Sequence, residues 1–322
     1  MATWTSRRLR GCVWTALVLL AGLAGYSAAQ TADDKKAGTA GSAEVLRELE
    51  RAKRLATQDR YLLRYKFRKG DVLKWKVVHL ATTETTIQEK PETSKTRSVA
   101  IRRWEVLDVD EDGNATIEVT VEEVEMWQHI SDRAEVSYNS RTDKTAPPEY
   151  MAVAETVGVP LLKAKVTPNG QIVGRNRPKK GFDLGLGEMT IPFPKTALAV
   201  GKSWYVPRDL MIQLPGGMVK RIKIRQKYTL VKVETGVATI RVESQPVTPV
   251  NNPQIEAQLM QDLIDGTVRF DLDAGCLLSR QVDWDDTVVE FAGPASMIKY
   301  RARLTEKRIP STPKTANAAS GE

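Results

Sequence analysis

The sequence predicts a mainly β fold: an antiparallel sandwich or a curved half-barrel built from two similar β-rich halves, each with an inserted helix. Three observations support this prediction. Apolar and charged residues alternate with a period of two over many segments, which is typical of half-buried strands. Short turns rich in Gly and Asp separate these segments, as they do in hairpins. In addition, one strand-turn-strand motif occurs twice in the chain.

The N-terminal segment has the features of a secretory signal peptide. A basic stretch that ends at Arg10 precedes the uncharged apolar run Val13–Ala24, and small residues follow at Ser27–Ala29. This order predicts cleavage at the end of the small-residue stretch, so residues 1–29 are interpreted as the signal peptide. The alternative is an uncleaved anchor helix, for which the run is diluted by residues such as Gly22. We therefore expect an exported protein of the periplasm or the extracellular space.

The next segments connect the signal peptide to the β-rich region. Residues 30–41 are small and charged, which predicts a flexible tether. Residues 42–60 predict an amphipathic helix that Ser42 caps and whose apolar residues share one face. The remaining boundaries are a first β-rich half at 61–175, a Gly- and Pro-rich linker at 176–193, a second β-rich half at 194–309 and a disordered tail at 310–322.

Period-two alternation predicts the individual strands. Leu63, Tyr65 and Phe67, for example, alternate with basic residues. The predicted strands are Leu63–Phe67, Leu73–Val77, Val99–Val109, Ala115–Trp127, Ala164–Thr167, Gln171–Gly174, Lys220–Val233, Val237–Gln245, Gly266–Asp271, Cys276–Asp283 and Met297–Arg308.

An internal repeat relates the two halves. Residues 106–119 read Val-Leu-Asp-Val, a turn at Gly113 and then Ala-Thr-Ile-Glu-Val. Residues 230–242 read Leu-Val-Lys-Val, a turn at Gly236 and then Ala-Thr-Ile-Arg-Val. A unit of so few strands buries its apolar face poorly by itself, so we expect the two halves to share one core.

The residues around the repeat follow the same order in both halves. Upstream, Gly70 and Trp75 correspond to Gly201 and Trp204. Downstream, each half contains a predicted helix, with Pro at its first turn in both cases and a capping Asn in the second. These helices are predicted at Pro148–Val157 and Asn252–Ile264.

Several short motifs carry a resemblance. They are the opening Arg64-Tyr-Lys-Phe-x-x-Gly70-Asp-x-x-x-Trp75, the hairpin Thr167-Pro-x-Gly170, and Pro192-Phe-Pro194 followed by Val200-Gly201-x-Ser-Trp204. Together they resemble secreted bacterial proteins grouped as a domain of unknown function, over most of the chain after the signal peptide. This resemblance implies no activity. In the order of strands and helices alone, the chain also resembles periplasmic lipoprotein-carrier folds.

Metal and nucleophile motifs are weak. The acidic run Asp108–Gly113 fits the start of a calcium loop, but Val119 occupies the closing bidentate position, so a hairpin turn is the better interpretation. The two histidines, His79 and His129, are too few for a zinc site. Cys276 follows a hairpin turn without an identifiable base. The sequence therefore predicts no metal, no cofactor and no catalytic residue of these classes.

Paired carboxylates leave one enzymatic alternative open. Asp283, Asp285, Asp286 and Glu290 surround Trp284, and glycosidases need two carboxylates at the right separation but no fixed spacing in sequence. Acidic residues beside a turn are more commonly solvent-facing charges, so a carbohydrate-active enzyme is the third hypothesis.

The charge balance argues against nucleic acid as a partner. The chain has 48 Lys and Arg against 40 Asp and Glu, a net charge of +8. Loss of the three arginines of the signal peptide leaves 45 against 40, an excess of +5, and no nucleic-acid motif is present. Basic residues along Lys220–Lys227 suit an anionic envelope polymer, although acidic residues on neighbouring strands favour cross-strand pairing. No further apolar run is long enough for a transmembrane segment.

The leading hypothesis is an exported, noncatalytic envelope protein. We expect it to bind an apolar or amphipathic ligand, such as a lipid or another amphiphile, or an envelope component, on the concave face of the β fold. The alternative is a structural or interaction protein of the cell envelope. The predicted ligand-binding residues are the apolar residues of the two inserted helices: Met151, Val153, Val157, Ile255, Leu259 and Leu263.

Overall fold

The computed structural model describes residues 59–176, 189–214 and 217–310. The predicted signal peptide, tether and most of the amphipathic helix, the central part of the linker and nearly all of the tail lie outside these residues. The strands are β1 (Arg60–Tyr61), β2 (Val72–Ile87), β3 (Lys90–Val109), β4 (Ala115–Ile130), β5 (Val136–Asn139), β6 (Pro160–Val166), β7 (Ile172–Asn176), β8 (Leu198–Ala199), β9 (Ser203–Gln213), β10 (Val219–Glu234), β11 (Val237–Pro246), β12 (Asp265–Asp271), β13 (Cys276–Val289) and β14 (Met297–Ile309).

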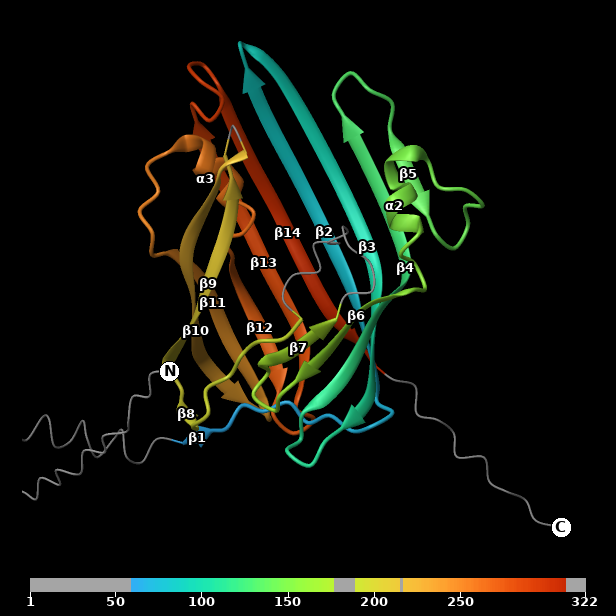
Figure 1. The fold of residues 1–322 in the computed structure, drawn as a ribbon, viewed down its shortest axis with the longest axis vertical. Coiled ribbons are helices and arrows are strands. Elements are labelled where there is room, and N and C mark those ends of the chain that lie inside the picture. Colours follow the sequence, from blue (N-terminus) through green and yellow to red (C-terminus); the bar gives the residue numbers. More distant parts are fainter. Residues whose placement is uncertain (1–58, 177–188, 215–216, 311–322) are drawn as a thin grey trace, which may run out of the picture. The chain divides into compact units, whose positions relative to one another are not determined.

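The predicted mainly β, antiparallel fold is confirmed. Eleven strands follow one another in a single antiparallel sheet in the order β7-β6-β4-β3-β2-β14-β13-β12-β11-β10-β9, and β5 pairs with β4 beside this path. The sheet is curved and open, with β7 and β9 at the two ends of the path (Figure 1). The last strand, β14, lies in the middle of the sheet, between β2 and β13.

The alternation of residue types explains why the strands form. In β10, Ile222, Ile224 and Leu230 are buried while Arg221 and Lys223 are exposed on the other face. This strand was predicted at Lys220–Val233 and lies at Val219–Glu234. The prediction is accurate because every second residue of the strand directs its side chain into the core.

One predicted strand is not part of the sheet, and one strand of the sheet was not predicted. Leu63–Phe67 alternates as predicted and buries Leu63 and Tyr65, but it is an extended segment outside the sheet. Its backbone amides donate hydrogen bonds to hairpin turns instead: Tyr65 N to Pro168 O at 2.7 Å and Lys66 N to Gly275 O at 3.1 Å. Conversely, β9 was not predicted, because Pro207 and the charged residues after it interrupt the alternation.

The two halves make the same hydrogen bonds at the residues that the repeat aligns. Gly70 N donates to Val106 O at 2.8 Å, and Gly201 N donates to Leu230 O at 2.7 Å. The strand registers agree as well. Val106 is paired with Ile117 and Leu230 with Ile240, and each pairing is followed by a shift of register on the first strand of its hairpin.

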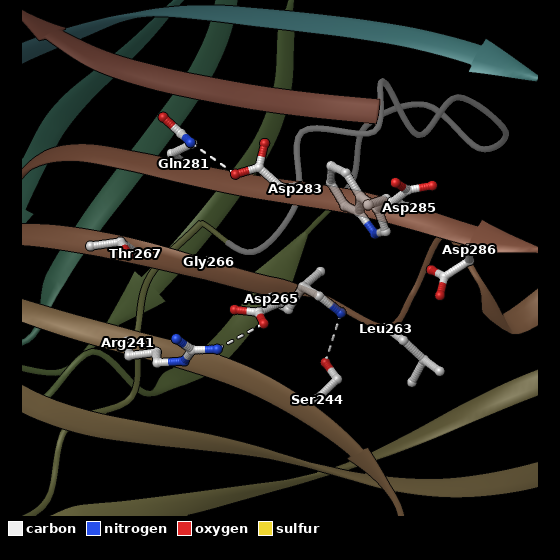
Figure 2. A pocket seen from close by; sticks show the side chains of 12 residues that line it. Arg241, Ser244, Leu263, Asp265, Gly266, Thr267, Gln281, Asp283, Asp285 and Asp286 are labelled. Atoms are coloured by element: carbon white, nitrogen blue, oxygen red, sulfur yellow. Dashed lines mark hydrogen bonds and ion pairs between the residues drawn. The ribbon is translucent and has the colours of Figure 1, made fainter. Parts of the chain in front are cut away.

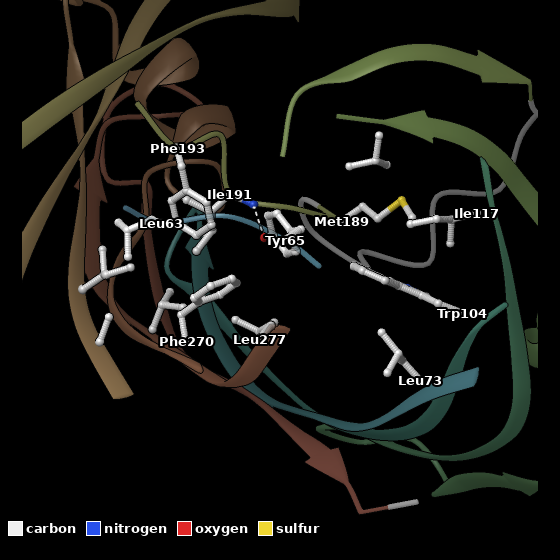
Figure 3. Close-up of a cluster of buried hydrophobic side chains, with 14 of the residues drawn as sticks. Leu63, Tyr65, Leu73, Trp104, Ile117, Met189, Ile191, Phe193, Phe270 and Leu277 are labelled. Carbon is white, nitrogen blue, oxygen red and sulfur yellow. Dashed lines mark hydrogen bonds between the residues drawn. The ribbon is translucent and has the colours of Figure 1, made fainter. Parts of the chain in front are cut away.

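The main core lies at one end of the curved sheet. There, two plug segments, residues 61–67 and 189–194, run across the concave face and contribute Leu63, Tyr65, Ile191 and Phe193 to the buried cluster. Figure 3 shows these side chains surrounded by the strands, with Phe270 and Trp104 among them. The plug segments thus fill the concave side of the sheet at the end that carries the β6–β7 and β12–β13 turns.

One glycine permits this plug to approach the β6–β7 turn. Gly170 has φ +80°, and a Cβ atom at this position would lie 2.2 Å from the carbonyl oxygen of Ile191 and 2.7 Å from the ring of Tyr65. We expect Gly170→Ala to lower the free energy of unfolding by at least about 2 kcal/mol, from backbone strain plus steric overlap. Gly158→Ala is the control, since Gly158 has φ +74° with no atom near its Cβ position. Urea denaturation measures both variants, and an equal loss would contradict a role for the close approach.

Candidate functional site

The concave face of the sheet is filled most completely at one end. Along β2, the side chains on this face are buried at Leu73, Trp75 and Val77, but are half-exposed from His79 through Ala81 towards the end of the strand. The antiparallel strand β3 shows the same change on the N-terminal side of its buried residues Trp104 and Arg102. The described side chains therefore cover the far end of the concave face less completely, although Tyr300 is buried there in a small cluster with Met260 and Val288. We call this part the open hollow.

Aromatic side chains line the wall of the open hollow. The ring of His79 lies 6.0 Å from that of Trp284 in an edge-to-face arrangement, and Trp284 lies 6.3 Å from Tyr300. The hydroxyl of Tyr300 and Nε2 of His79 are 3.4 Å apart. Burial lowers the pKa of His79, so its neutral form is favoured. The strand register adds small and apolar neighbours to this wall: Ala81, Ala302 and Leu304.

The indole of Trp284 also brings a hydrogen-bond donor to this wall. Its Nε1 atom is buried and has no hydrogen-bond partner among the described residues. A buried donor without a partner is costly to stability. Trp284 thus combines an apolar ring with a donor that a ligand oxygen can accept from.

The predicted ligand-binding residues of the first helix lie beside the hollow in a small cluster of their own. The helix consists of the 3-10 turn η1 (Pro148–Tyr150) and α2 (Met151–Ala154), which ends three residues earlier than predicted. Val153 is buried against β4 and β5, and Val157 packs on the same cluster. Met151 is 55 % exposed, so it does not contribute to this cluster.

The predicted residues of the second helix pack near the other end of the strand order, on β9 and β10. As predicted, Asn252 caps α3 (Pro253–Leu259), accepting from Gln254 N at 2.8 Å. The helix ends five residues earlier than predicted. Ile255 and Leu259 are buried against β9 and β10, and Leu263 packs on them. The structure therefore places the two predicted sets in two separate clusters. Trp284 and Tyr300 of the aromatic wall pack in a third cluster, together with Ala257 of α3 and Met260 directly after it.

A charged layer separates the open hollow from the main core. Glu306 of β14 lies between Arg280 of β13 and Arg102 of β3, and all three side chains are at least nine-tenths buried. Arg280 Nη2 donates to Glu306 Oε2 at 2.6 Å, and Arg102 forms an ion pair with Oε1 of the same carboxylate. The guanidinium of Arg102 also lies over the Trp104 ring, at 5.8 Å from its centre.

Further polar groups face this layer from β10 and β9, the last two strands at one end of the sheet path. Tyr228 of β10 is buried and donates to Gln226 at 2.8 Å. Burial raises the pKa of Tyr228 to about 12, against the opposing influence of Arg208 and Arg280. Arg208 of the end strand β9 is thus near Arg280 across the hollow. We call Arg102, Arg208, Arg280 and Glu306 the arginine layer.

A groove of about 590 Å³ opens where β12 begins (Figure 2). β13 pairs with β12 only up to Asp283, and α3 lies near the part of β13 beyond it. The groove is lined by Leu263 and Trp284 together with several carboxylates, and Asp265 in it forms an ion pair with Arg241 at 2.9 Å. The groove thus adjoins the wall of the open hollow at Trp284.

Three of the four carboxylates considered for glycosidase chemistry, Asp283, Asp285 and Asp286, line this groove but face different sides of the sheet, and Glu290 is not among the lining residues. Asp283 and Asp286 are three residues apart on a regular strand, so their side chains point to opposite faces. Asp283 forms an ion pair with Arg303 at 2.5 Å. Burial raises the pKa of Asp283, but hydrogen bonds from Gln281 and Arg303 outweigh this and lower it. Burial raises the pKa of Asp286, and the charge of Asp285 adds to this effect.

Other residues noted in the sequence serve the structure locally. Asp110 is half-exposed and accepts hydrogen bonds from Lys165 and Asn114, which lower its pKa to about 2. Within the described ranges, no group of three or more His, Cys, Asp or Glu residues has an arrangement that could hold a metal ion. Cys276 is buried and lies 2.7 Å from Arg308 Nη1. Burial raises the pKa of its thiol.

The basic face of β10 is mostly paired. Arg221 forms an ion pair with Asp209 at 3.6 Å, and Lys227 forms one with Glu243 at 3.5 Å. Arg225 lies 5.0 Å from the ring centre of Tyr205. Arg221 and Lys227 thus form cross-strand pairs with acidic residues of the neighbouring strands, as the sequence predicted, whereas Arg225 contacts an aromatic ring.

Comparisons of this chain with protein-family models, curated proteins and solved structures found no match. Among the helices of the described residues, none combines the length and the apolar content needed to cross a membrane. The geometry of the site therefore carries the functional argument.

Proposed function

We propose that this chain binds an apolar or amphipathic molecule in the open hollow of its sheet, and that it does so as an exported, noncatalytic protein of the cell envelope. The observation that carries this proposal is the change from buried to half-exposed side chains along the concave face of β2 and β3. A cup that is filled at one end and lined by aromatic and aliphatic groups at the other suits a ligand with a long apolar part.

The two helix clusters support this proposal in a different way from the one the sequence predicted. They attach α2 and α3 to the sheet on either side of the hollow, since each cluster packs on its own strands. The wall itself comes from β2, β13 and β14. We therefore assign ligand contact to His79 and Trp284, and a supporting role to the buried Tyr300 and to the predicted helix residues.

The duplicated order of strands and helices also fits this role. We propose that the two halves arose as copies of one unit, which agrees with their shared register shift and glycine contacts. Joined side by side, two such units enclose a hollow between them. The alternative, a structural or interaction protein using its basic face, is less favoured because that face is largely paired.

A pair of tryptophan substitutions tests the site. Ala81 points into the hollow and its neighbour Thr82 points to the convex face, yet both are half-buried. We expect Ala81→Trp to fill the hollow and to weaken binding of the uncharged fluorophore N-phenyl-1-naphthylamine by at least about tenfold, a loss of roughly 1.4 kcal/mol. Thr82→Trp should leave binding unchanged. Fluorescence titration measures both, and equal effects of the two variants would refute the site.

The natural occupant is sought by mass spectrometry. The chain is expressed with its N-terminal segment, purified without detergent and extracted with organic solvent. The proposal expects an amphiphile near one per protein that is absent from a control protein of the same compartment and reduced in Ala81→Trp. An extract identical to that of the control, together with no fluorophore binding, would transfer our preference to the interaction protein.

A further inference from the structure

The groove at the start of β12 offers hydrogen-bond donors as well as acceptors. Arg241, Gln281 and Trp284 bring N–H donors to its lining, and the carboxylates of Asp265 and Asp285 bring acceptors. Nε1 of Trp284 is buried and has no hydrogen-bond partner among the described residues. A bound molecule that satisfies this lining must therefore carry groups that accept and groups that donate.

The polar side chains of the groove hold one another in place. Arg241 Nη2 donates to Asp265 Oδ2 at 2.9 Å, and Gln281 Nε2 donates to Asp283 Oδ2 at 2.8 Å (Figure 2). A side chain that is already ordered loses less conformational entropy when it binds a ligand. The groove thus presents fixed polar groups, and its volume of about 590 Å³ lies within the range of small-molecule sites.

The groove adjoins the open hollow because the sheet is incomplete at this point. Within the described ranges, β13 has no partner strand on the side of β12 beyond Asp283. Side chains from both faces of β13 therefore border the groove, Asp285 from the convex face and Trp284 from the concave face. Since Trp284 belongs to both sites, a molecule whose apolar part lies in the hollow can reach the groove with its polar end.

The lining favours one of the three kinds of polar end that an amphiphile can carry. An acidic end would lie beside Asp286, whose pKa is raised by burial and by the charge of Asp285, so a further anion is unfavourable there. An ammonium end donates but cannot accept, so it would leave the buried donor of Trp284 without a partner. An uncharged hydroxyl both donates and accepts, and so matches the lining.

We propose that the groove binds a saccharide unit, and that this unit is the polar end of the amphiphile in the open hollow. This inference rests on the proposed function and narrows it to glycolipids and related glycosides. A sugar ring carries several hydroxyl groups around an apolar C–H face, which suits fixed polar side chains beside an indole.

Amphiphiles with equal chains and different polar ends test this inference. Octyl glucoside, octyl maltoside, octanoate, octylammonium and 1-octanol are each used, below the concentrations at which they form micelles, to displace N-phenyl-1-naphthylamine from the full chain. We expect at least one glycoside to displace the fluorophore at a concentration about tenfold lower than each of the other three molecules. Equal displacement by glycosides and 1-octanol, or tighter binding of octanoate or octylammonium, would overturn the inference while leaving the proposed function intact.

Free glucose and maltose distinguish a sugar-bearing amphiphile from a soluble saccharide. Titration calorimetry should show that each free sugar binds at least about tenfold more weakly than its octyl glycoside, because the free sugar lacks the apolar part. Equal affinities of sugar and glycoside would overturn the link between the groove and the hollow.

The matched variants are Thr267→Trp and Arg269→Trp. Both residues are exposed on the same face of β12, but only Thr267 lines the groove. Thr267→Trp should fill the groove, weaken the preferred glycoside by about tenfold and leave 1-octanol unchanged, whereas Arg269→Trp should alter neither. No change in Thr267→Trp, or an equal loss for glycoside and alcohol, would refute the assignment of the groove. If none of the amphiphiles displaces the fluorophore, or the fluorophore itself does not bind, both this inference and the proposed function fail.

Discussion

Replacing Glu306 by Gln is expected to lower the free energy of unfolding by about 3–5 kcal/mol, because this one carboxylate neutralises two buried guanidiniums. The amide keeps the shape of the side chain but not its charge, so Arg102 and Arg280 would face each other without a shared anion. Urea denaturation followed by tryptophan fluorescence measures the loss. Glu84→Gln is the control, since Glu84 pairs with Arg301 on an exposed part of the sheet and should contribute at most about 1 kcal/mol.

A second variant separates the effect of unpaired charge on stability from the effect of altered packing. Replacing these three residues together by apolar residues, as Arg102→Met, Glu306→Leu and Arg280→Met, should recover much of the stability lost in Glu306→Gln, because none of the three buried charges remains. If Glu306→Gln costs less than about 1 kcal/mol, the carboxylate is not the anion on which the layer depends.

Truncating Phe270 to Ala should cost about 3–5 kcal/mol, the range typical of a fully buried aromatic residue. Phe270 belongs to β12 and is completely buried. Its ring contacts one residue from each plug segment: Tyr65 at 5.1 Å between ring centres and Phe193 at 4.8 Å. The substitution therefore leaves a cavity at the point where the plug meets the sheet.

Stability and hydrogen exchange together measure this effect. We expect the amides of Tyr65 and Ile191, which lie in the plug segments, to lose more protection from exchange than those of β3. Tyr205→Ala is the control, because Tyr205 is 53 % exposed on the convex face. A uniform loss of protection across the sheet would show that the plug does not respond separately from it.

The sequence predicted the strands best where one face is buried and the other is charged. β10 and β11 were placed within one residue of their ends, since Ile224 and Ile240 alternate with basic residues that remain in solvent. The helix cap at Asn252 was predicted for a similar reason: its side chain competes for backbone amides at the first turn. These are local signals, which a single sequence contains.

The end segments of β2 and β3 were missed, and their sequence explains why. Beyond His79, the residues of β2 that face the hollow are small or polar, such as Ala81 and Thr83, so apolar alternation disappears. The pattern is lost along the part of the strand where the core no longer covers the concave face. In retrospect, a run of β-branched and polar residues continuing a strand was the signal of the hollow.

The candidate wall and the arginine layer were beyond the reach of sequence patterns. Tyr300 and His79 are 221 residues apart in the chain and meet because β14 pairs with β2. Arg102, Arg280 and Glu306 looked like ordinary members of charged strands, and nothing local showed that they share one face. Pairing between distant strands, which alternation does not specify, decides which residues meet.

The central place of β14 has a consequence for how this chain folds. When synthesis proceeds from the N-terminus, β2 and β13 are complete before the strand that separates them, so each initially presents an unpaired edge. Their joining requires closure of a very long loop, which makes the final step slow and dependent on contacts remote in sequence. Until then, the two unpaired edges are open to association with other chains, so protection from aggregation during maturation is as much a requirement of this topology as its final stability.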